Sequence, residues 1–393
     1  MNRRVYMDHT ATTPLDPRVL EAMQPYFSEK FGNASSVHQY GQEAKAALEL
    51  SRDRIAAFIH AKPAEIFFTT GGTESDNFAI KGAALAARAK GRKHIITNRS
   101  EHHAVLETCE YLEEIGYAVS YLPVDEYGMV DPDAVRRAVT PGTCLVSIMH
   151  ANNEVGTINP IEEIAGIAHE HGILFHTDTV QTVGKIPVDV GAMGIDLLGI
   201  SGHKIYGPKG IGAIYIKKGV EIEKFMHGGG QERGRRAGTE NVPLAVGLGK
   251  TIELREMEMA EESIRLQTLK ERLRRGIEER LEGHIFNGHL THSLSHILNV
   301  SFNRSKIDID GDVLLLSMDL NGVAVTSGSA CTSGSMDPSH VLLAMGRDER
   351  TAKATLRFSM GKMNTEEDVE YVLDVLEDVV TKIGKPTSRN HNS

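Results

Sequence analysis

The chain has 393 residues, of which 40 % are hydrophobic and 24 % are charged, and its formal net charge at pH 7 is −10. These values are ordinary for a globular protein of two or three domains, and the negative charge argues against a broad nucleic-acid-binding surface. Cys109, Cys144 and Cys331 are too few and too widely spaced for a disulfide framework or a zinc site. The N-terminal stretch lacks the apolar run of a signal peptide, and no run of about 18 apolar residues could span a membrane, so we expect a cytoplasmic location.

Short apolar runs alternate with amphipathic helical patterns from about residue 40 to residue 260. A helix is predicted over 43–61, and strands are predicted over 65–70, 94–97, 144–149, 173–177, 197–200 and 212–216. Alternation of strands and helices predicts a mostly parallel sheet. Several of the runs end in small, polar or charged residues, where α/β proteins place their chemistry.

The pattern changes in the last third of the chain. A charged helix rich in Glu, Arg and Leu is predicted over about 252–282, and it would suit a connector between domains. Beyond it, 297–302 and 323–325 read as strands of a smaller α+β unit. Thr365 and Asp368 have the spacing of a capping box, which opens a helix with a regular apolar face.

A lysine follows the fifth predicted strand, in the segment Ser201-Gly202-His203-Lys204. A lysine held in a partly dry pocket has a lowered pKa and can form a Schiff base. Considered alone, this segment favours the plainer alternative of a solvated loop lysine, because buried lysines are rare.

Two other strand ends carry polar groups suited to a phosphorylated ring. Between a strand and a helix, the glycines of 70–77 would let backbone N–H groups approach a phosphate, with Thr73 adding a hydroxyl. In 176–181, Asp178 could hold a pyridinium N–H. A plain helix N-cap is the alternative in both places.

Cys331 lies in the small, polar stretch 327–335, unlike a core cysteine, and that stretch suits a thiol that must travel. An incidental loop cysteine is the alternative, whereas Cys109 and Cys144 read as buried. His102, just past the strand at 94–97, can stack on a ring or shuttle protons. A metal site there is disfavoured, because His102 and His103 are adjacent and no HExxH spacing occurs.

Taken together, these motifs resemble those of the NifS/IscS group of cysteine desulfurases, which are class-V, fold-type I enzymes dependent on pyridoxal 5'-phosphate (PLP). The resemblance extends from about residue 5 to residue 380. Its most specific segments are 11–14, 73–77, 150–154, 201–210, 228–234, 237–241 and 327–333.

The resemblance implies an α/β fold of the aspartate-aminotransferase-like kind. A large PLP-binding domain over 15–255 would contain a mostly parallel mixed sheet. Residues 1–14 and 256–385 would form a smaller α+β domain that carries the Cys331 loop, and 386–393 would be a disordered tail. A homodimer is also implied.

The resemblance assigns roles residue by residue. Lys204 would carry the cofactor. The phosphate would be held by Gly72, Thr73, Ser201, His203 and, from the neighbouring subunit, Thr239. Around the ring would lie Asp178 at the pyridine nitrogen, His102 stacked on one face as an acid–base group, Val180 on the other face, and Gln181 and Asn153 at the phenolic oxygen or the substrate. The substrate carboxylate would be held by Asn33 and Arg357, and a bidentate guanidinium suits that task.

The implied reaction converts L-cysteine to L-alanine. Lys204 would remove the α-proton, and the Cys331 thiolate would take the sulfur as a persulfide. An IscU-type iron–sulfur scaffold, or a sulfur relay for tRNA thiolation, would then accept it. No intrinsic metal is expected, although Cys331 is left open as a transient ligand of an iron–sulfur cluster.

Two alternatives compete with this interpretation. A selenocysteine lyase or another fold-type I enzyme would share the fold, which hosts many reactions; the polar Cys331 loop argues against an aminotransferase. A non-catalytic scaffold-binding protein is the second alternative. Lys204, Asp178 and Cys331 are all present, which argues against it.

Overall fold

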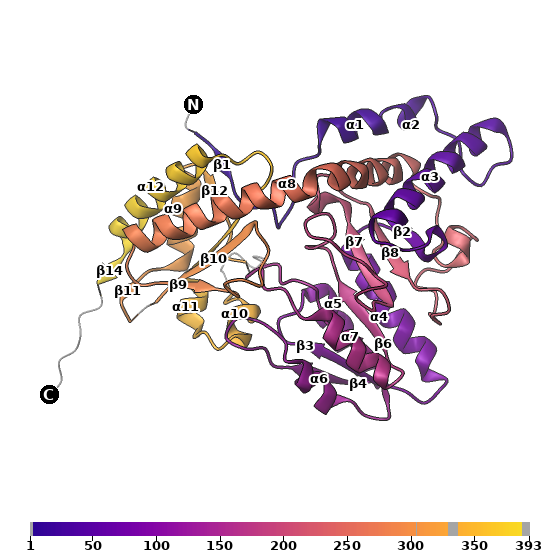
Figure 1. Cartoon of the computed structure of the whole chain (residues 1–393), viewed down its shortest axis with the longest axis horizontal. Coiled ribbons are helices and arrows are strands. Elements are labelled where there is room, and N and C mark those ends of the chain that lie inside the picture. Colours follow the sequence, from indigo (N-terminus) through magenta and orange to yellow (C-terminus); the bar gives the residue numbers. More distant parts are fainter. Residues whose placement is uncertain (1–2, 304, 329–336, 387–393) are drawn as a thin grey trace.

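The computed structural model describes residues 3–303, 305–328 and 337–386 (Figure 1). Cys331 lies outside the described residues, as does the predicted disordered tail apart from its first residue. That residue, Pro386, belongs instead to the short strand β14 (Lys385–Pro386), which pairs with β11 (Ile307–Asp308). Within the described ranges, no helix combines the length and the apolar character needed to cross a bilayer.

A seven-stranded sheet forms the larger half of the molecule, in the order β2-β8-β7-β6-β5-β3-β4. The strands are β2 (Ile66–Thr69), β3 (His94–Asn98), β4 (Ala118–Leu122), β5 (Thr143–Ser147), β6 (Leu174–Asp178), β7 (Leu197–Ser201) and β8 (Gly212–Ile216). Strand β8 runs antiparallel to the other six strands of this sheet. The predicted mostly parallel sheet is therefore confirmed, and its carboxyl ends lie at one edge.

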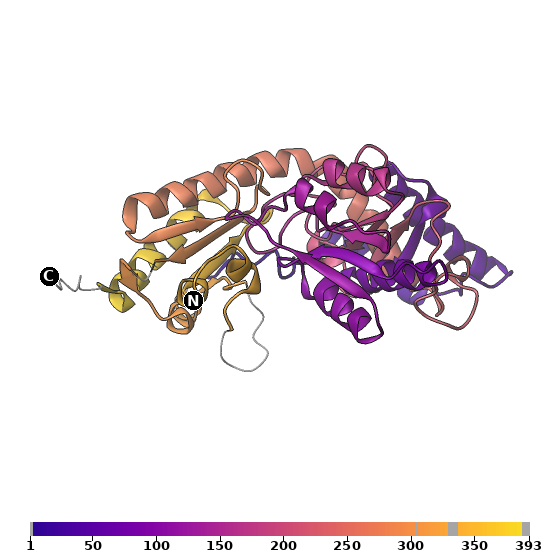
Figure 2. The same cartoon turned by 90° about the horizontal axis from the view of Figure 1, so that it is seen from below.

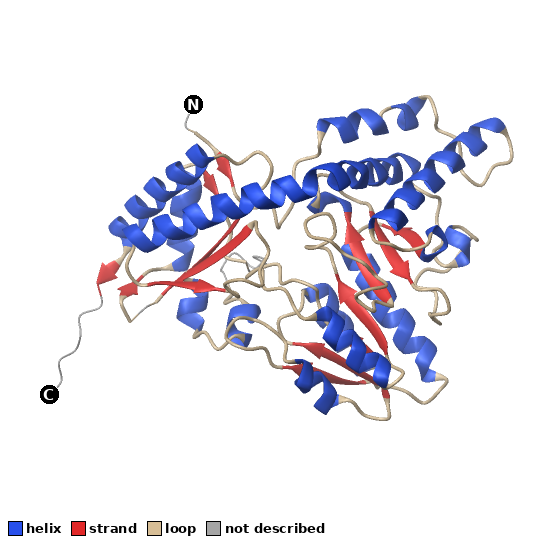
Figure 3. Cartoon of the chain, in the orientation of Figure 1, coloured by secondary structure: helices blue, strands red, loops and turns tan. Residues whose placement is uncertain are grey.

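Helices cover both faces of this sheet (Figure 3). On one face lie α4 (Gly72–Arg88) and α5 (His103–Glu114), which bury Phe78 and Leu112 against the strands. On the other lie α3 (Gln39–Phe58), α6 (Pro132–Ala138), α7 (Ile161–Glu170) and the first part of α8, with Ile55 and Ile164 in the core. The short helices α1 (Pro17–Met23) and α2 (Pro25–Ser28) precede them.

Helix α8 (Val242–Arg280) spans both halves of the molecule (Figure 1). Its first turns pack in the core of the large sheet through Leu248, and its last turns pack in a second core through Leu273. It begins ten residues before the predicted start. The side chain of Asn241 accepts a bond from Leu244 N at 3.2 Å, and tertiary burial stabilises a glycine-rich stretch of low helix propensity.

The smaller half contains an antiparallel sheet of β13 (Thr355–Ser359), β10 (Ile297–Phe302) and β9 (His284–Asn287). Strand β1 (Val5–Tyr6) pairs with β12 (Val323–Ala324), so the N-terminal segment joins this half. Its helices are α9 (Gly311–Leu320), α10 (His340–Ala344), α11 (Glu349–Lys353) and α12 (Glu366–Ile383), the last with the predicted capping box of Thr365 and Asp368. In Figure 2 the two halves lie side by side beneath α8. The domain boundaries given above remain a prediction.

Candidate active site

A cavity of about 350 Å³ lies where the carboxyl ends of the large sheet meet the smaller half. Such a volume suits a small cofactor with a substrate. The cavity is lined by eleven of the residues singled out from the sequence: Gly72, Thr73, His102, Asn153, Asp178, Val180, Gln181, Ser201, His203, Lys204 and Arg357.

Lys204 ends a short 3₁₀ turn, Gly202–Lys204, directly after β7. Its Nζ donates to the carbonyl oxygens of Thr10 at 2.5 Å and Ala11 at 2.8 Å. Burial lowers its pKa to about 8, the charge of Arg357 acts in the same direction, and Asp178 opposes both. The amine therefore has a much larger neutral fraction near neutral pH than an exposed lysine, as a nucleophile requires.

Asp178 ends β6, and its carboxylate accepts a bond from Val180 N at 2.8 Å. Burial raises its pKa to about 6, and the carboxyl of Asp76 acts in the same direction. A buried carboxylate that faces a cavity binds a cation readily, because a cation offsets the cost of burying the charge.

His102 is the N-cap residue of α5, and its Nδ1 accepts a bond from Ala104 N at 3.0 Å. Because Nδ1 is the acceptor, the neutral ring carries its proton on Nε2. Burial lowers the pKa of His102, the charge of Asp178 opposes this shift, and the charge of Lys204 acts with burial. The lowered pKa favours a neutral imidazole at the cavity.

The N-terminus of α4 also faces the cavity. Its N-cap Gly71 supplies no side-chain bond, so the first N–H groups of α4 remain available to an anion. A Cβ at Gly72 would lie 2.5 Å from Cγ2 of Val180, so only glycine fits there. His203 bonds Thr12 Oγ1 at 3.1 Å, and burial lowers its pKa to about 4.

Two more side chains hold unused polar atoms inside the site. Gln181 Nε2 donates to Thr10 O at 3.1 Å, and its buried Oε1 has no partner in the described structure. Arg357, on β13, donates from Nη1 to Asn153 O at 3.0 Å and from Nη2 to Asp8 Oδ1 at 2.9 Å. Its buried Nε has no partner there either.

The profile of the aminotransferase class-V family matches residues 5–372. This chain belongs to that family. It is 52 % identical to cysteine desulfurase IscS of Dictyoglomus turgidum, over 98 % of this chain and 96 % of that protein. It is also 52 % identical to cysteine desulfurase IscS of Methanosarcina thermophila, over 97 % of this chain and 93 % of that protein.

Solved structures agree. A NifS-like protein superposes with a TM-score of 0.89 and 41 % identity, covering 97 % of this chain and all of its own. SspA in complex with cysteine superposes with a TM-score of 0.81 and 40 % identity, covering 91 % of this chain and 99 % of its own. The resemblance to the NifS/IscS group and the fold-type I architecture are therefore confirmed.

Class-V enzymes of this group depend on PLP, and the cavity fits that cofactor. The fit rests on a lysine of lowered pKa, a buried carboxylate and an uncapped helix N-terminus around one space. These supply an amine, a partner for a ring cation and donors for a phosphate.

Two predicted residues, Asn33 and Thr239, do not line the cavity. Asn33, between α2 and α3, is exposed, and its Oδ1 accepts a bond from Ser35 N at 2.9 Å. Thr239 is exposed in the segment before α8. Cys331 lies outside the described residues. Their roles remain predictions.

Three acidic residues in and around the site were not predicted from the sequence. Asp8 pairs with Arg357. Asp76 lines the cavity, and its Oδ1 lies 3.5 Å from His176 Nε2. Glu101 is buried and accepts a bond from Met149 N at 2.7 Å. Asp76 could have been found from the sequence, because it falls on the apolar face of α4, where a carboxylate is costly to bury unless it has a function.

Proposed function

We propose that this chain is a cysteine desulfurase that converts L-cysteine to L-alanine and keeps the sulfur on Cys331 as a persulfide. The observation that carries the proposal is the convergence of Lys204, Asp178 and Arg357 on one cavity. An amine, a carboxylate and a guanidinium are the groups that an amino-acid-transforming PLP site needs. Relatives named cysteine desulfurase cover nearly the whole chain at 52 % identity.

Bound PLP supplies an electron sink that stabilises negative charge on the α-carbon of the substrate. Asp178 would hold the ring nitrogen of bound PLP through its negative charge. Lys204 Nζ accepts the α-proton, for which its lowered pKa is suited. Arg357 binds the substrate carboxylate, and His102 offers a proton at Nε2.

The sulfur transfer belongs to Cys331. Its thiolate attacks the substrate sulfur, an S–S bond forms, and the C–S bond breaks. The electron pair of the broken bond stays with the substrate carbon, which takes a proton. A proton also returns to the α-carbon from Lys204, and L-alanine leaves. Since a thiolate is the nucleophile, a reducing, cytoplasmic setting suits this step.

We further propose a homodimer in which Thr239 of one chain approaches the phosphate site of the other. Exposed large apolar side chains flank Asn33, and contiguous exposure of this kind marks protein contacts. They are Phe27, Phe31, Val37 and Tyr40, exposed by 59, 65, 89 and 55 %. Light scattering on the purified chain tests the dimer, and Val37→Asp should weaken it.

The sulfur then passes to an acceptor, which we propose to be an IscU-type iron–sulfur scaffold or a relay protein for tRNA thiolation. The support is the name IscS of the relatives. A radiolabelled persulfide on Cys331 that transfers to a purified scaffold protein would support the first acceptor.

The decisive experiment measures alanine and sulfide released from L-cysteine by the purified protein with PLP and a reductant. Cys331→Ala should stay yellow but release no alanine, whereas Lys204→Ala should lose both turnover and covalent cofactor. If the wild type is yellow and inert towards L-cysteine but consumes L-selenocysteine or another amino acid, the substrate assignment fails.

A further inference from the structure

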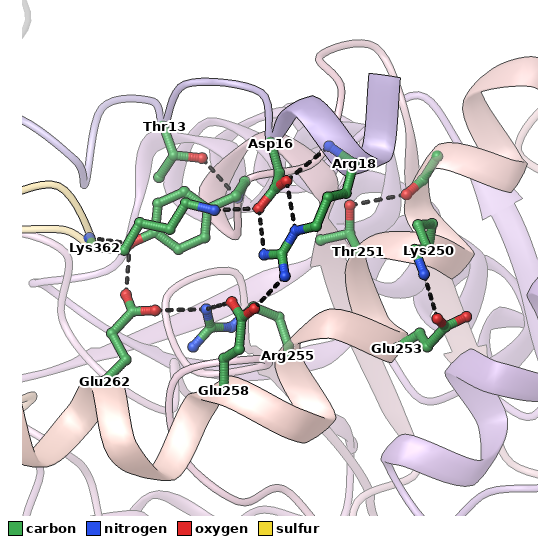
Figure 4. Close-up of polar contacts among 12 residues, drawn as sticks. Thr13, Asp16, Arg18, Lys250, Thr251, Glu253, Arg255, Glu258, Glu262 and Lys362 are labelled. Atoms are coloured by element: carbon green, nitrogen blue, oxygen red, sulfur yellow. Dashed lines mark hydrogen bonds and ion pairs between the residues drawn. The ribbon is translucent and has the colours of Figure 1, made fainter. Parts of the chain in front are cut away.

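A charged seam joins the smaller half of the molecule to the larger half (Figure 4). It consists of Asp16, Tyr206, Arg255, Glu262 and Lys362. Lys362 follows β13 and lies five residues after Arg357. Its Nζ donates to Asp16 Oδ2, and its backbone N donates to Tyr206 Oη at 2.9 Å. These two hydrogen bonds connect the segment that follows the strand of Arg357 to the N-terminal segment and to the segment that carries Lys204.

Tyr206 is the centre of this seam. Its Oη donates to Glu262 Oε1 at 2.6 Å, and the other carboxylate oxygen of Glu262 accepts from Arg255 Nη1 at 2.6 Å. Its ring lies between two cations, Lys362 Nζ at 4.8 Å and Arg255 Cζ at 5.4 Å from the centroid. Glu262 and Arg255 belong to α8, so one buried side chain contacts both α8 and the segment after β13.

The backbone of Tyr206 is held in an uncommon conformation. Its φ is +69°, in the left-handed region where glycine is less costly. Tyr206 N donates to Thr13 Oγ1 at 2.7 Å, and Asp16 N donates to Tyr206 O at 3.0 Å. Thr13 Oγ1 in turn donates to His203 O at 2.9 Å, next to Lys204. Strain that is held on both sides of a residue points to a role for its side chain.

We propose that Tyr206 is a positioning residue that fixes Arg357 relative to Lys204. The inference rests on the roles proposed above for those two residues. Lys204 lies two positions before Tyr206, and Arg357 lies five positions before the segment that Tyr206 binds. Without the hydroxyl, the halves sample arrangements in which the amine and the guanidinium do not share one substrate. The apparent affinity then falls with the fraction of competent molecules.

The test is Tyr206→Phe in the PLP-loaded protein. We expect the KM for L-cysteine and the Kd for L-alanine, read from the cofactor absorbance, to rise together by about three- to ten-fold. Of the two bonds lost, only the one from Lys362 N joins the strand of Arg357 to Tyr206, and the range is that for the loss of one net hydrogen bond. The kcat should stay within about two-fold, because no group that touches the reacting atoms is removed.

Tyr117→Phe is the matched control. Tyr117 is buried, and its Oη donates to Ala84 O at 2.9 Å, away from the cavity. Tyr117→Phe should lower the Tm by about as much as Tyr206→Phe does. The KM for L-cysteine and the Kd for L-alanine should stay unchanged. A purely structural role for Tyr206 would give the same pattern as Tyr117→Phe.

A second variant, Lys362→Met, removes the contact with Asp16 and the cation over the ring, and it carries the test if Tyr206→Phe does not fold. It should raise the KM and the L-alanine Kd in the same direction. Unchanged values in both folded variants, or a fall in kcat with an unchanged Kd, overturn the inference. An active wild type with an inactive Arg357→Ala upholds the proposed function independently of either result.

Discussion

Asp8 and Arg357 form an ion pair, with 2.9 Å between Asp8 Oδ1 and Arg357 Nη2, beside the cavity that contains Lys204. The guanidinium proposed to receive the substrate carboxylate therefore already holds one carboxylate. Both partners act on Lys204, since the charge of Arg357 lowers its pKa and the charge of Asp8 raises it. The pair thus links substrate recognition to the protonation of the amine.

Asp8→Asn should lower the pKa of Lys204 below its value of about 8, because the substitution removes a negative charge that favours the ammonium form. The neutral amine is the form that combines with PLP. In cofactor-free protein, the pH midpoint of the rate of PLP recombination should therefore move to lower pH.

Asp133→Asn, a change of an exposed carboxylate in the first turn of α6, is the control and should leave that midpoint in place. An upward or absent shift in Asp8→Asn would contradict the electrostatic role given to Asp8.

Gly72→Ala should weaken PLP binding about ten-fold or more. The new Cβ would lie 2.5 Å from Cγ2 of Val180, and overpacking of this kind costs about 1–3 kcal/mol. Gly72→Ala should cost less PLP affinity in a Val180→Ala background than in the wild type. The double variant is therefore compared with Val180→Ala alone. Equilibrium binding of PLP, measured by absorbance, checks both results.

Gly166→Ala is the matched control, because a Cβ at Gly166 would meet no atom within 4 Å. It lies inside α7, where alanine is favoured over glycine, so stability should rise slightly and PLP affinity should not change. Equal losses of affinity in the two alanine variants would refute the steric argument.

Much of the site could be predicted because local pattern and chemistry coincide at strand ends. Lys204 lies three residues after β7 and Asp178 ends β6, so the short apolar runs place both residues at strand ends. The pairing of Asp8 with Arg357 spans 349 positions and leaves no local signal. The contact of Tyr206 with Lys362 spans 156 positions and likewise leaves no local pattern in the sequence. Such contacts depend on how the two halves pack.

Glu232→Gln should cost about 3 kcal/mol of stability. Its carboxylate forms a bidentate pair with Arg52, at 2.8 and 2.9 Å, and also accepts from Phe68 N at 2.8 Å. Both side chains are 3 % exposed, and breaking the pair leaves the buried guanidinium of Arg52 with only the exposed carboxylate of Glu49 as its partner. Urea unfolding of the two proteins at pH 7 measures the difference.

Glu170→Gln provides the comparison, since Glu170 pairs with Arg136 at an exposed position. Exposed pairs of this kind contribute little. A loss in Glu232→Gln as small as that in Glu170→Gln would show that the buried pair is not important for stability.

The pH dependence of stability should report Lys185, which is half-buried beside the seam with Nζ 2.8 Å from His296 Nε2. Burial lowers the pKa of Lys185 from 10.5 to about 7, the charges of Lys204, Arg255 and Arg357 act in the same direction, and Glu262 opposes them. Burial also holds the pKa of His296 well below its usual value, with the charge of Lys185 acting in the same direction.

Between about pH 7 and 10.5, the unfolded chain carries the Lys185 proton and the folded chain does not. Stability from this group therefore rises with pH in that window, by up to about 1.4 kcal/mol per pH unit, and it is flat below the window. Lys185→Met removes the rise. Urea unfolding at pH 7, 8 and 9 should show the free energy of unfolding of the wild type rising relative to that of the variant at each step. The two proteins share all other titrating groups. Parallel pH profiles for the two proteins would mean that Lys185 is charged in the folded state.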